Sequence, residues 1–176
     1  LALGELQVSA ERDVTITGGF EAGDININTA ELFNSGSVTS NTLNINANDV
    51  VNDGQLYSIA DTTLNLQNEL TNAGTILAND ANVMSHKITN DGVMYVNNMA
   101  MTANSLNQGG HMITLNDLSV NATEVTNNGV VSVGNDASIV GSKLTNAGTI
   151  TVGGNTRLNV EDIINTNTMQ LEGDLY

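Results

Sequence analysis

The sequence predicts an all-β fold, a parallel β-helix (a solenoid) of about nine coils with roughly 19 residues in each coil. Three observations predict this fold. The heptapeptide LTNAGTI occurs twice, at residues 70–76 and 144–150, and degenerate copies of it recur along the chain. Apolar and polar residues alternate, which is typical of short strands. No segment with helical periodicity interrupts the alternation.

The heptapeptide follows the pattern apolar-x-Asn-x-Gly-x-apolar. The central positions of its copies are 34, 52, 72, 90, 108, 127, 146 and 165, so that the copies are separated by steps of 18 to 20 residues. A nearly constant period of this length is typical of architectures in which each repeat forms one coil. We therefore expect each strand to stack on its equivalent in the next coil, about 4.8 Å away.

The apolar residues predict three inward columns. The first column precedes the Asn-Gly corner: Leu32, Val50, Leu70, Ile88, Leu106, Val125, Leu144 and Ile163. The second column follows the corner: Val38, Leu56, Ile76, Met94, Val131, Ile150 and Met169. The third consists of pairs of apolar residues two positions apart: Leu6/Val8, Ile25/Ile27, Leu43/Ile45, Leu64/Leu66, Ala81/Val83, Met99/Met101, Leu118/Val120, Ala137/Ile139 and Leu158/Val160.

The polar letters of the motif are interpreted as structural. Its asparagines are expected to stack into a ladder in which each carboxamide bonds to the next. The members of this ladder are Asn34, Asn52, Asn72, Asn90, Asn127, Asn146 and Asn165. The corner glycines are expected to adopt positive φ, which glycine does without steric penalty. They are Gly36, Gly54, Gly74, Gly92, Gly110, Gly129 and Gly148.

Composition excludes several classes of function. The chain of 176 residues has 19 acidic and 4 basic residues, and its net charge of -15 repels nucleic acid and anionic lipid. It has no cysteine, and therefore neither a thiol nucleophile nor a thiolate metal site. No apolar run is long enough to insert into a membrane. We expect residues 1–176 to form a single repeat segment that is a fragment of a longer protein.

Catalysis is not expected, and neither are a bound cofactor or a metal. A carbohydrate-active β-helix enzyme remains the alternative of another class, but it needs clustered carboxylates beside a cation. The basic residues Arg12, Lys87, Lys143 and Arg157 lie too far apart in the repeat to share such a site. A column of turn acids, Asp61, Asp80, Asp117, Asp136 and Asp174, suggests either weak calcium binding between coils or solvated turns that favour aspartate.

One outward column departs from the polar character of the surface. Three residues after the corner glycine, the side chains of Tyr57, Leu77, Tyr95 and Ile113 are expected to face outward in successive coils. Thr39 and Ser132 flank them, and if the register slips at the Gly-Gly pair then Met112 replaces Ile113 on the surface. Contiguous exposed apolar residues often mark an interface. We interpret these four residues, called the apolar stripe below, as a candidate interaction surface.

The units LTNAGTITVGGNTRLNV and VTNNGVVSVGNDASIV resemble the haemagglutinin repeats of filamentous haemagglutinin-like two-partner-secretion exoproteins, a group that includes large adhesins and contact-dependent growth inhibition exoproteins. The resemblance implies a right-handed winding, export through an outer-membrane secretion partner, and a place on the cell surface of a Gram-negative bacterium or in its secretions. It implies a structural and adhesive shaft segment that recognises a host or bacterial surface receptor, whether protein or glycan. The alternative within this family is the receptor-recognition segment of a contact-dependent growth inhibition exoprotein.

Overall fold

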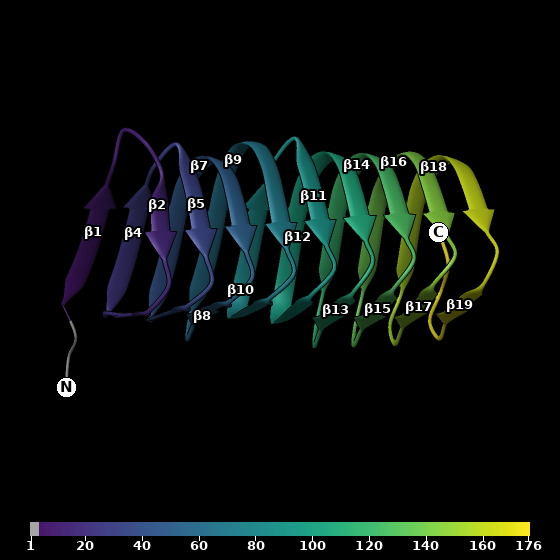
Figure 1. The fold of residues 1–176 in the computed structure, drawn as a ribbon. Coiled ribbons are helices and arrows are strands. Elements are labelled where there is room, and N and C mark those ends of the chain that lie inside the picture. Colours follow the sequence, from purple (N-terminus) through teal and green to yellow (C-terminus); the bar gives the residue numbers. More distant parts are fainter. Residues whose placement is uncertain (1–3) are drawn as a thin grey trace.

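The computed structural model describes residues 4–176, and within them 19 strands form one continuous parallel sheet. The sheet winds into a β-solenoid of about 9 turns with about 19 residues in each, as the repeat predicts. Figure 1 shows the turns following one another along a single axis, with β1 and β19 at opposite ends of the rod.

Each turn has three sides. Side 1 ends at the ladder position, side 2 follows the corner glycine, and side 3 carries the paired apolar residues. Side 1 alone contains β2 (Val14–Ile16), β5 (Glu31–Asn34) and β11 (Lys87–Asn90). Side 2 alone contains β3 (Gly19–Glu21), β6 (Ser37–Ser40), β8 (Gln55–Ser58), β13 (His111–Thr114), β15 (Val130–Val133), β17 (Thr149–Val152) and β19 (Thr168–Leu171). Side 3 alone contains β1 (Glu5–Ser9) and β4 (Asp24–Asn28).

The remaining strands bend around corners. Five run from side 3 into side 1: β7 (Thr42–Asn52), β9 (Asp61–Asn72), β14 (Leu118–Asn127), β16 (Ala137–Asn146) and β18 (Thr156–Asn165). Strand β10 (Thr75–Met84) runs from side 2 into side 3, and β12 (Val93–Gln108) passes along all three sides. The corner between sides 3 and 1 is thus a gentle bend that keeps its backbone in the sheet.

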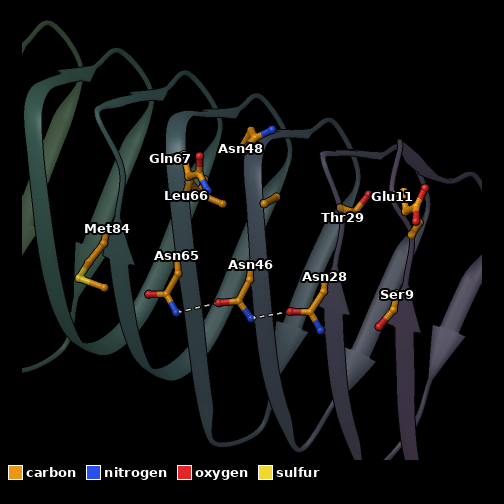
Figure 2. A pocket seen from close by; sticks show the side chains of 12 residues that line it. Ser9, Glu11, Asn28, Thr29, Asn46, Asn48, Asn65, Leu66, Gln67 and Met84 are labelled. Atoms are coloured by element: carbon orange, nitrogen blue, oxygen red, sulfur yellow. Dashed lines mark hydrogen bonds between the residues drawn. The ribbon is translucent and has the colours of Figure 1, made fainter.

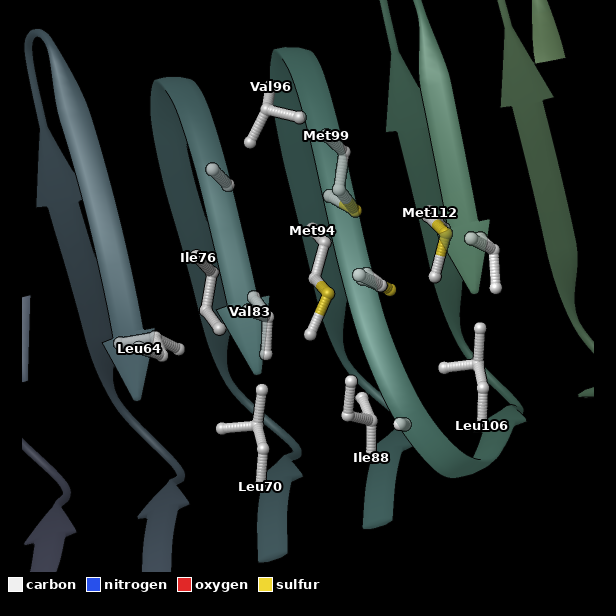
Figure 3. Packing of buried hydrophobic residues seen from close by; sticks show 14 of the residues in the cluster. Leu64, Leu70, Ile76, Val83, Ile88, Met94, Val96, Met99, Leu106 and Met112 are labelled. Atoms are coloured by element: carbon white, nitrogen blue, oxygen red, sulfur yellow. The ribbon is translucent and has the colours of Figure 1, made fainter. Parts of the chain in front are cut away.

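The register joins each residue to its equivalent one turn away. Leu70, for example, pairs with Val50 in the preceding turn and with Ile88 in the following one. The three predicted apolar columns point inward, and most of their side chains are buried. Four methionines, Met94, Met99, Met101 and Met112, fill the bore of the middle turns (Figure 3). Their unbranched side chains can fill an irregular space between stacked aliphatic columns.

The prediction that the corner glycines adopt positive φ is wrong. Within residues 4–176 no glycine has a positive φ. The reason for glycine is close approach: a Cβ added at Gly74 would overlap the carbonyl oxygen of Gly54 in the preceding turn, and the other corner glycines repeat this contact. Glycine is therefore required because successive corners stack backbone on backbone.

Candidate interaction surfaces

The four residues of the apolar stripe lie in one column on side 2. Tyr57 pairs with Leu77, Leu77 with Tyr95, and Tyr95 with Ile113. Tyr95 is 39% exposed and the other three are half-buried, as neighbours in a stacked column shield one another. Met112 is buried in the bore, so that the outward residue of this turn is Ile113.

A second outward column widens the apolar surface. It places Val93, His111 and Val130 in successive turns beside the stripe, with both valines half-buried and the histidine exposed. Exposed aspartates stand at both ends of side 2 in this part of the rod. Asp53 and Asp91 lie at the Asn-Gly corner, and Asp61 and Asp117 lie where side 2 leads into side 3. The apolar area is therefore bordered by negative charge on two edges.

At the end of side 1, the motif asparagines form rows of hydrogen bonds that run from turn to turn. Asn34, Asn52 and Asn72 each donate Nδ2 to the Oδ1 of the next asparagine at 2.7 Å. Asn127 and Asn146 do the same toward Asn146 and Asn165, at the same distance. The same Nδ2 groups of Asn34, Asn52, Asn127 and Asn146 also donate to a backbone carbonyl at the start of side 2 one turn further on. All but the terminal Asn165 are buried.

Gln108 occupies the ladder position between Asn90 and Asn127. Its Oε1 accepts the Nδ2 proton of Asn90 at 2.8 Å, but its Nε2 donates to the backbone oxygen of Val130 at 3.3 Å. As a result the Oδ1 of Asn127, which is buried, has no hydrogen-bond partner. The ladder is thus divided into two runs at this turn.

The turn acids stand between sides 2 and 3, where they bind the backbone of the following turn. The Oδ1 of Asp117 accepts from the backbone nitrogen of Asp136 at 3.1 Å, and the Oδ1 of Asp136 accepts from the backbone nitrogen of Asn155 at 2.7 Å. These bonds cross from coil to coil, whereas the turn interpretation expected only local backbone contacts. Within residues 4–176 no group of three or more His, Asp or Glu side chains has the arrangement of a metal site.

These acids border a shallow groove of about 840 Å³ on side 3, which the sequence did not predict. Thr63, Asn82, Ser119 and Ser138 contribute to its floor, and Arg157 and Tyr176 lie at its C-terminal end. Arg157 pairs in register with Ser138 and so stands one turn beyond Asp136. A second groove, of about 670 Å³, lies nearer the N-terminus, at the end of side 3 where the chain bends into side 1.

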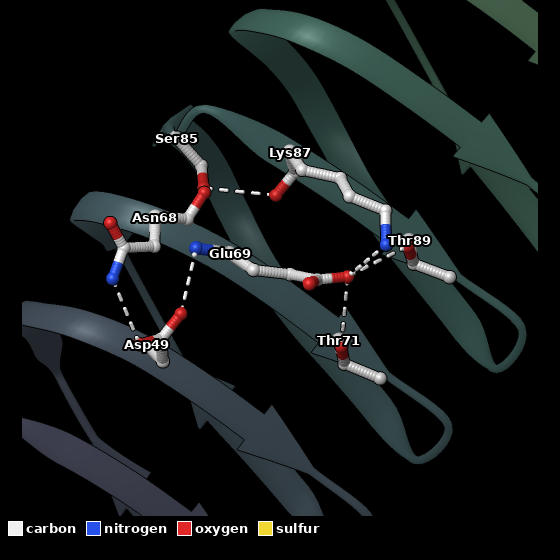
Figure 4. A network of polar contacts seen from close by, with 7 residues as sticks. All are labelled: Asp49, Asn68, Glu69, Thr71, Ser85, Lys87 and Thr89. Atoms are coloured by element: carbon white, nitrogen blue, oxygen red, sulfur yellow. Dashed lines mark hydrogen bonds and ion pairs between the residues drawn. The ribbon is translucent and has the colours of Figure 1, made fainter.

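A charged column on side 1 brings Lys87 and Lys143 close to acidic residues, although the sequence predicts no shared site for the basic residues. Glu31, Asp49, Glu69 and Lys87 follow one another in register, and Lys143 lies further along the same column between Glu124 and Asp162. Lys87 Nζ lies 2.7 Å from Glu69 Oε1 (Figure 4). This hydrogen bond, with smaller contributions from Thr89 and Thr71, lowers the pKa of Glu69 below its ordinary value, against the opposing effect of burial.

Comparison with protein-family models, with curated proteins and with solved structures found no match. The role of this protein is therefore inferred from its own residues. Across residues 4–176 there is no helix long and apolar enough to cross a bilayer.

Proposed function

We propose that this chain is a rigid shaft segment of a secreted bacterial cell-surface exoprotein, and that it contributes an adhesive surface through the apolar stripe. The observation that carries the proposal is the stripe itself, an unbroken outward column of four aromatic and aliphatic side chains, exposed at Tyr95 and half-buried at the other three. We assign the segment to the haemagglutinin-repeat region of filamentous haemagglutinin-like two-partner-secretion exoproteins of Gram-negative bacteria. A right-handed winding is part of the proposal, since crossovers between parallel strands are overwhelmingly right-handed.

The rod is suited to be a shaft because hydrogen bonds between neighbouring turns make it stiff. Neighbouring turns share backbone hydrogen bonds on all three sides, and the buried amide ladder adds side-chain bonds along the axis. Bending the rod would stretch these bonds on one side and compress the packed core on the other. Secretion through an outer-membrane partner, as the family resemblance implies, would deliver such a rod to the cell surface.

The stripe supports a role in attachment. Tyrosine offers apolar area together with a hydrogen-bonding hydroxyl, a combination that suits both protein and sugar partners. Aspartates border the stripe on two edges and the chain carries a net charge of -15, so we propose a receptor whose contact surface is neutral or basic. The receptor is a protein or glycan of a host or bacterial surface, and in the contact-dependent inhibition alternative it stands on a competing bacterium.

An enzyme is the weaker alternative. The groove of about 840 Å³ holds aspartates and Arg157, which is the kind of arrangement that a polysaccharide-cleaving solenoid needs. However, the carboxylates of Asp80, Asp117 and Asp136 already accept hydrogen bonds from the next turn. Their placement is accounted for by the turn that they stabilise, and we therefore favour binding over catalysis.

The decisive experiment compares cell attachment by two variants of the same rod. Tyr57→Ser with Tyr95→Ser removes the aromatic part of the stripe, while Thr39→Ala with Thr151→Ala alters the same column outside it. Both variants should keep the β circular dichroism of the native chain, because all four side chains point outward. We expect the tyrosine variant to lose attachment to host or bacterial cells and the threonine variant to retain it. Equal attachment by both folded variants would refute an adhesive role for the stripe.

A further inference from the structure

The N-terminal groove of side 3 has a lining unlike the rest of the surface. Its volume is about 670 Å³, and it spans the turns from Ser9 to Met84 (Figure 2). Glu11, at one end, is its single ionisable lining residue, although the chain as a whole carries 19 acids. A ligand in this groove would meet a neutral, hydrogen-bonding surface.

Carboxamides dominate the two walls of the groove. One wall is an outward ladder in which Asn46 Nδ2 donates to Asn28 Oδ1 at 3.0 Å and Asn65 Nδ2 donates to Asn46 Oδ1 at 3.1 Å (Figure 2). The other wall carries Asn48 and Gln67, whose side chains make no hydrogen bond within the described part of the chain. Asn46 donates one N–H and accepts one hydrogen bond within the ladder, and so it retains a second N–H and a second lone pair for a ligand.

The outward ladder ends on an acceptor that lacks a donor. Met84 pairs in register with Asn65, and so a methionine stands where the next asparagine would donate. The Oδ1 of Asn65 is shielded from water and has no hydrogen-bond partner. Met84 is 45% exposed, and its flexible side chain can move aside for a group that supplies the missing donor.

From these observations we infer that the N-terminal groove of side 3 binds a neutral glycan chain along the axis of the rod. Hydroxyl groups both donate and accept, which is the complement of a row of carboxamides. The C–H faces of sugar rings would rest on the displaced side chain of Met84, since Ala47 and Leu66 in the lining are buried. An anionic glycan would find no cation among the lining residues and would be repelled by the net charge.

A peptide strand fits this groove less well than a glycan. Peptides that bind along a sheet use the unpaired backbone groups of an edge strand. Here the backbone of β4 and most of the backbone of β7 and β9 is paired with both neighbouring turns, with a short interruption at the bulge of β9. The flank of the solenoid therefore offers mainly side chains, and no free strand edge runs along the groove. The site is on a different side from the apolar stripe, so this inference does not depend on the stripe.

The test titrates the 176-residue chain with cellohexaose, chitohexaose and maltohexaose, and with hexagalacturonate and hexalysine as charged comparators. We expect at least one neutral hexasaccharide to shift the side-chain amide resonances of Asn46, Asn48 and Gln67. The variant Asn48→Ala with Gln67→Ala should weaken this binding about tenfold, through the loss of two hydrogen bonds. The matched control, Asn121→Ala with Asn159→Ala, alters exposed asparagines further along the outward ladder column and should bind as the native chain does.

A second variant tests the acceptor without removing any groove amide. Met84→Asn places a donor beside Asn65 Oδ1 and should weaken glycan binding while leaving the fold intact. The inference is overturned if none of the neutral hexasaccharides binds, if hexalysine or hexagalacturonate binds in their place, or if the Asn48 and Gln67 variant binds unchanged. None of these outcomes bears on the stripe, because cell attachment through Tyr57 and Tyr95 is measured separately.

Discussion

At the scale of single residues, asparagine holds neighbouring turns in register. A carboxamide is both donor and acceptor, and the stacking of parallel strands repeats it at about 4.8 Å, which lets one amide bond directly to the next. The two longest examples are the buried ladder from Asn34 to Asn165 and the outward ladder of Asn28, Asn46 and Asn65. The two ladders run in opposite directions, and each leaves an acceptor without a donor where another residue type interrupts it.

Repairing the buried ladder should stabilise the protein. Gln108→Asn shortens the side chain by one methylene, so that its N–H group can donate to the unpartnered Oδ1 of Asn127, as in the other steps of the ladder. Satisfying a buried acceptor contributes about 1–3 kcal/mol, whereas the lost methylene costs about 0.8 kcal/mol. We expect a net gain of about 1 kcal/mol in the free energy of unfolding, measured by urea denaturation. Gln7→Asn, at an exposed glutamine of β1, should change the midpoint little. A lower midpoint for Gln108→Asn would show that the glutamine is the better-fitting residue.

The Lys87–Glu69 pair makes a small contribution that depends on pH. Because the folded state lowers the pKa of Glu69, the pair stabilises the chain above the unfolded glutamate pKa of about 4.3, and the effect is lost as the pH falls through the lower folded value. Both side chains are partly exposed, at 49% for Lys87 and 34% for Glu69, so the gain is at most about 1 kcal/mol. Glu69→Gln should therefore be slightly less stable than the native chain at pH 7. Urea midpoints that still differ by the same amount at pH 3 would contradict this account.

At the scale of elements, the Asn-Gly corner and the turn between sides 2 and 3 differ in whether they accommodate extra residues. The steps of 18 to 20 residues between ladder positions never add a residue at the Asn-Gly corner. Extra residues are placed instead in the turn between sides 2 and 3, where Ile59 and Leu115 are 63% and 47% exposed, and in a bulge of β9 opposite Ala47 and Asp49. The corner is invariant because an amide ladder and stacked backbones meet there, whereas the turn is open to solvent.

Substitution at the corner tests this contrast. Gly74→Ala would force the backbones of two turns apart, because its Cβ overlaps the carbonyl oxygen of Gly54. We expect a loss of about 3 kcal/mol in the free energy of unfolding, which is typical of overpacking that has to shift the backbone. Gly19→Ala is the control, since no atom lies within 4 Å of the added Cβ. Similar unfolding midpoints for the two alanine variants would mean that the corner is not tightly stacked.

The sequence predicts which side chains point into the bore better than it predicts which side chains contact one another between turns. Alternation places Leu70 or Ile76 inside, since one wrong step would turn a whole strand outward. Where the strands begin and end is not predicted by it, since β12 passes along all three sides without a break. The Lys87–Glu69 pair could have been found by aligning the repeats, since both residues stand three positions before a ladder asparagine. The side 3 grooves could not, because their depth depends on side-chain packing between turns.

At the scale of the whole molecule, each turn contacts its two neighbours and little else. The stability of such an array is approximately a sum over turns and the interfaces between them. A central turn is covered on both faces, and Leu43, Leu56 and Leu70 are accordingly fully buried. In the last described turn, Ile163 is 47% exposed, and Met169 and Leu171 are half-buried although they point toward the bore. The interfaces are therefore unequal along the rod.

Hydrogen exchange should reveal this inequality in the 176-residue chain. The backbone amides of β7, β9, β12 and β14 lie between two complete turns, so they should open only when several interfaces separate together. Thr156 and Leu158 at the start of β18 donate to Asp174 and Tyr176. The remaining strand amides of β18 and β19 depend on a single interface with β16 and β17, and should exchange through the opening of one turn. We expect protection to rise from both ends toward the middle, with a step near β13 and β15 where Gln108 divides the ladder. Gln108→Asn should remove the step and leave the gradient at the ends unchanged. Uniform protection in a monomeric sample would show that the rod unfolds as one cooperative unit, and that its turns are coupled more strongly than their interfaces suggest.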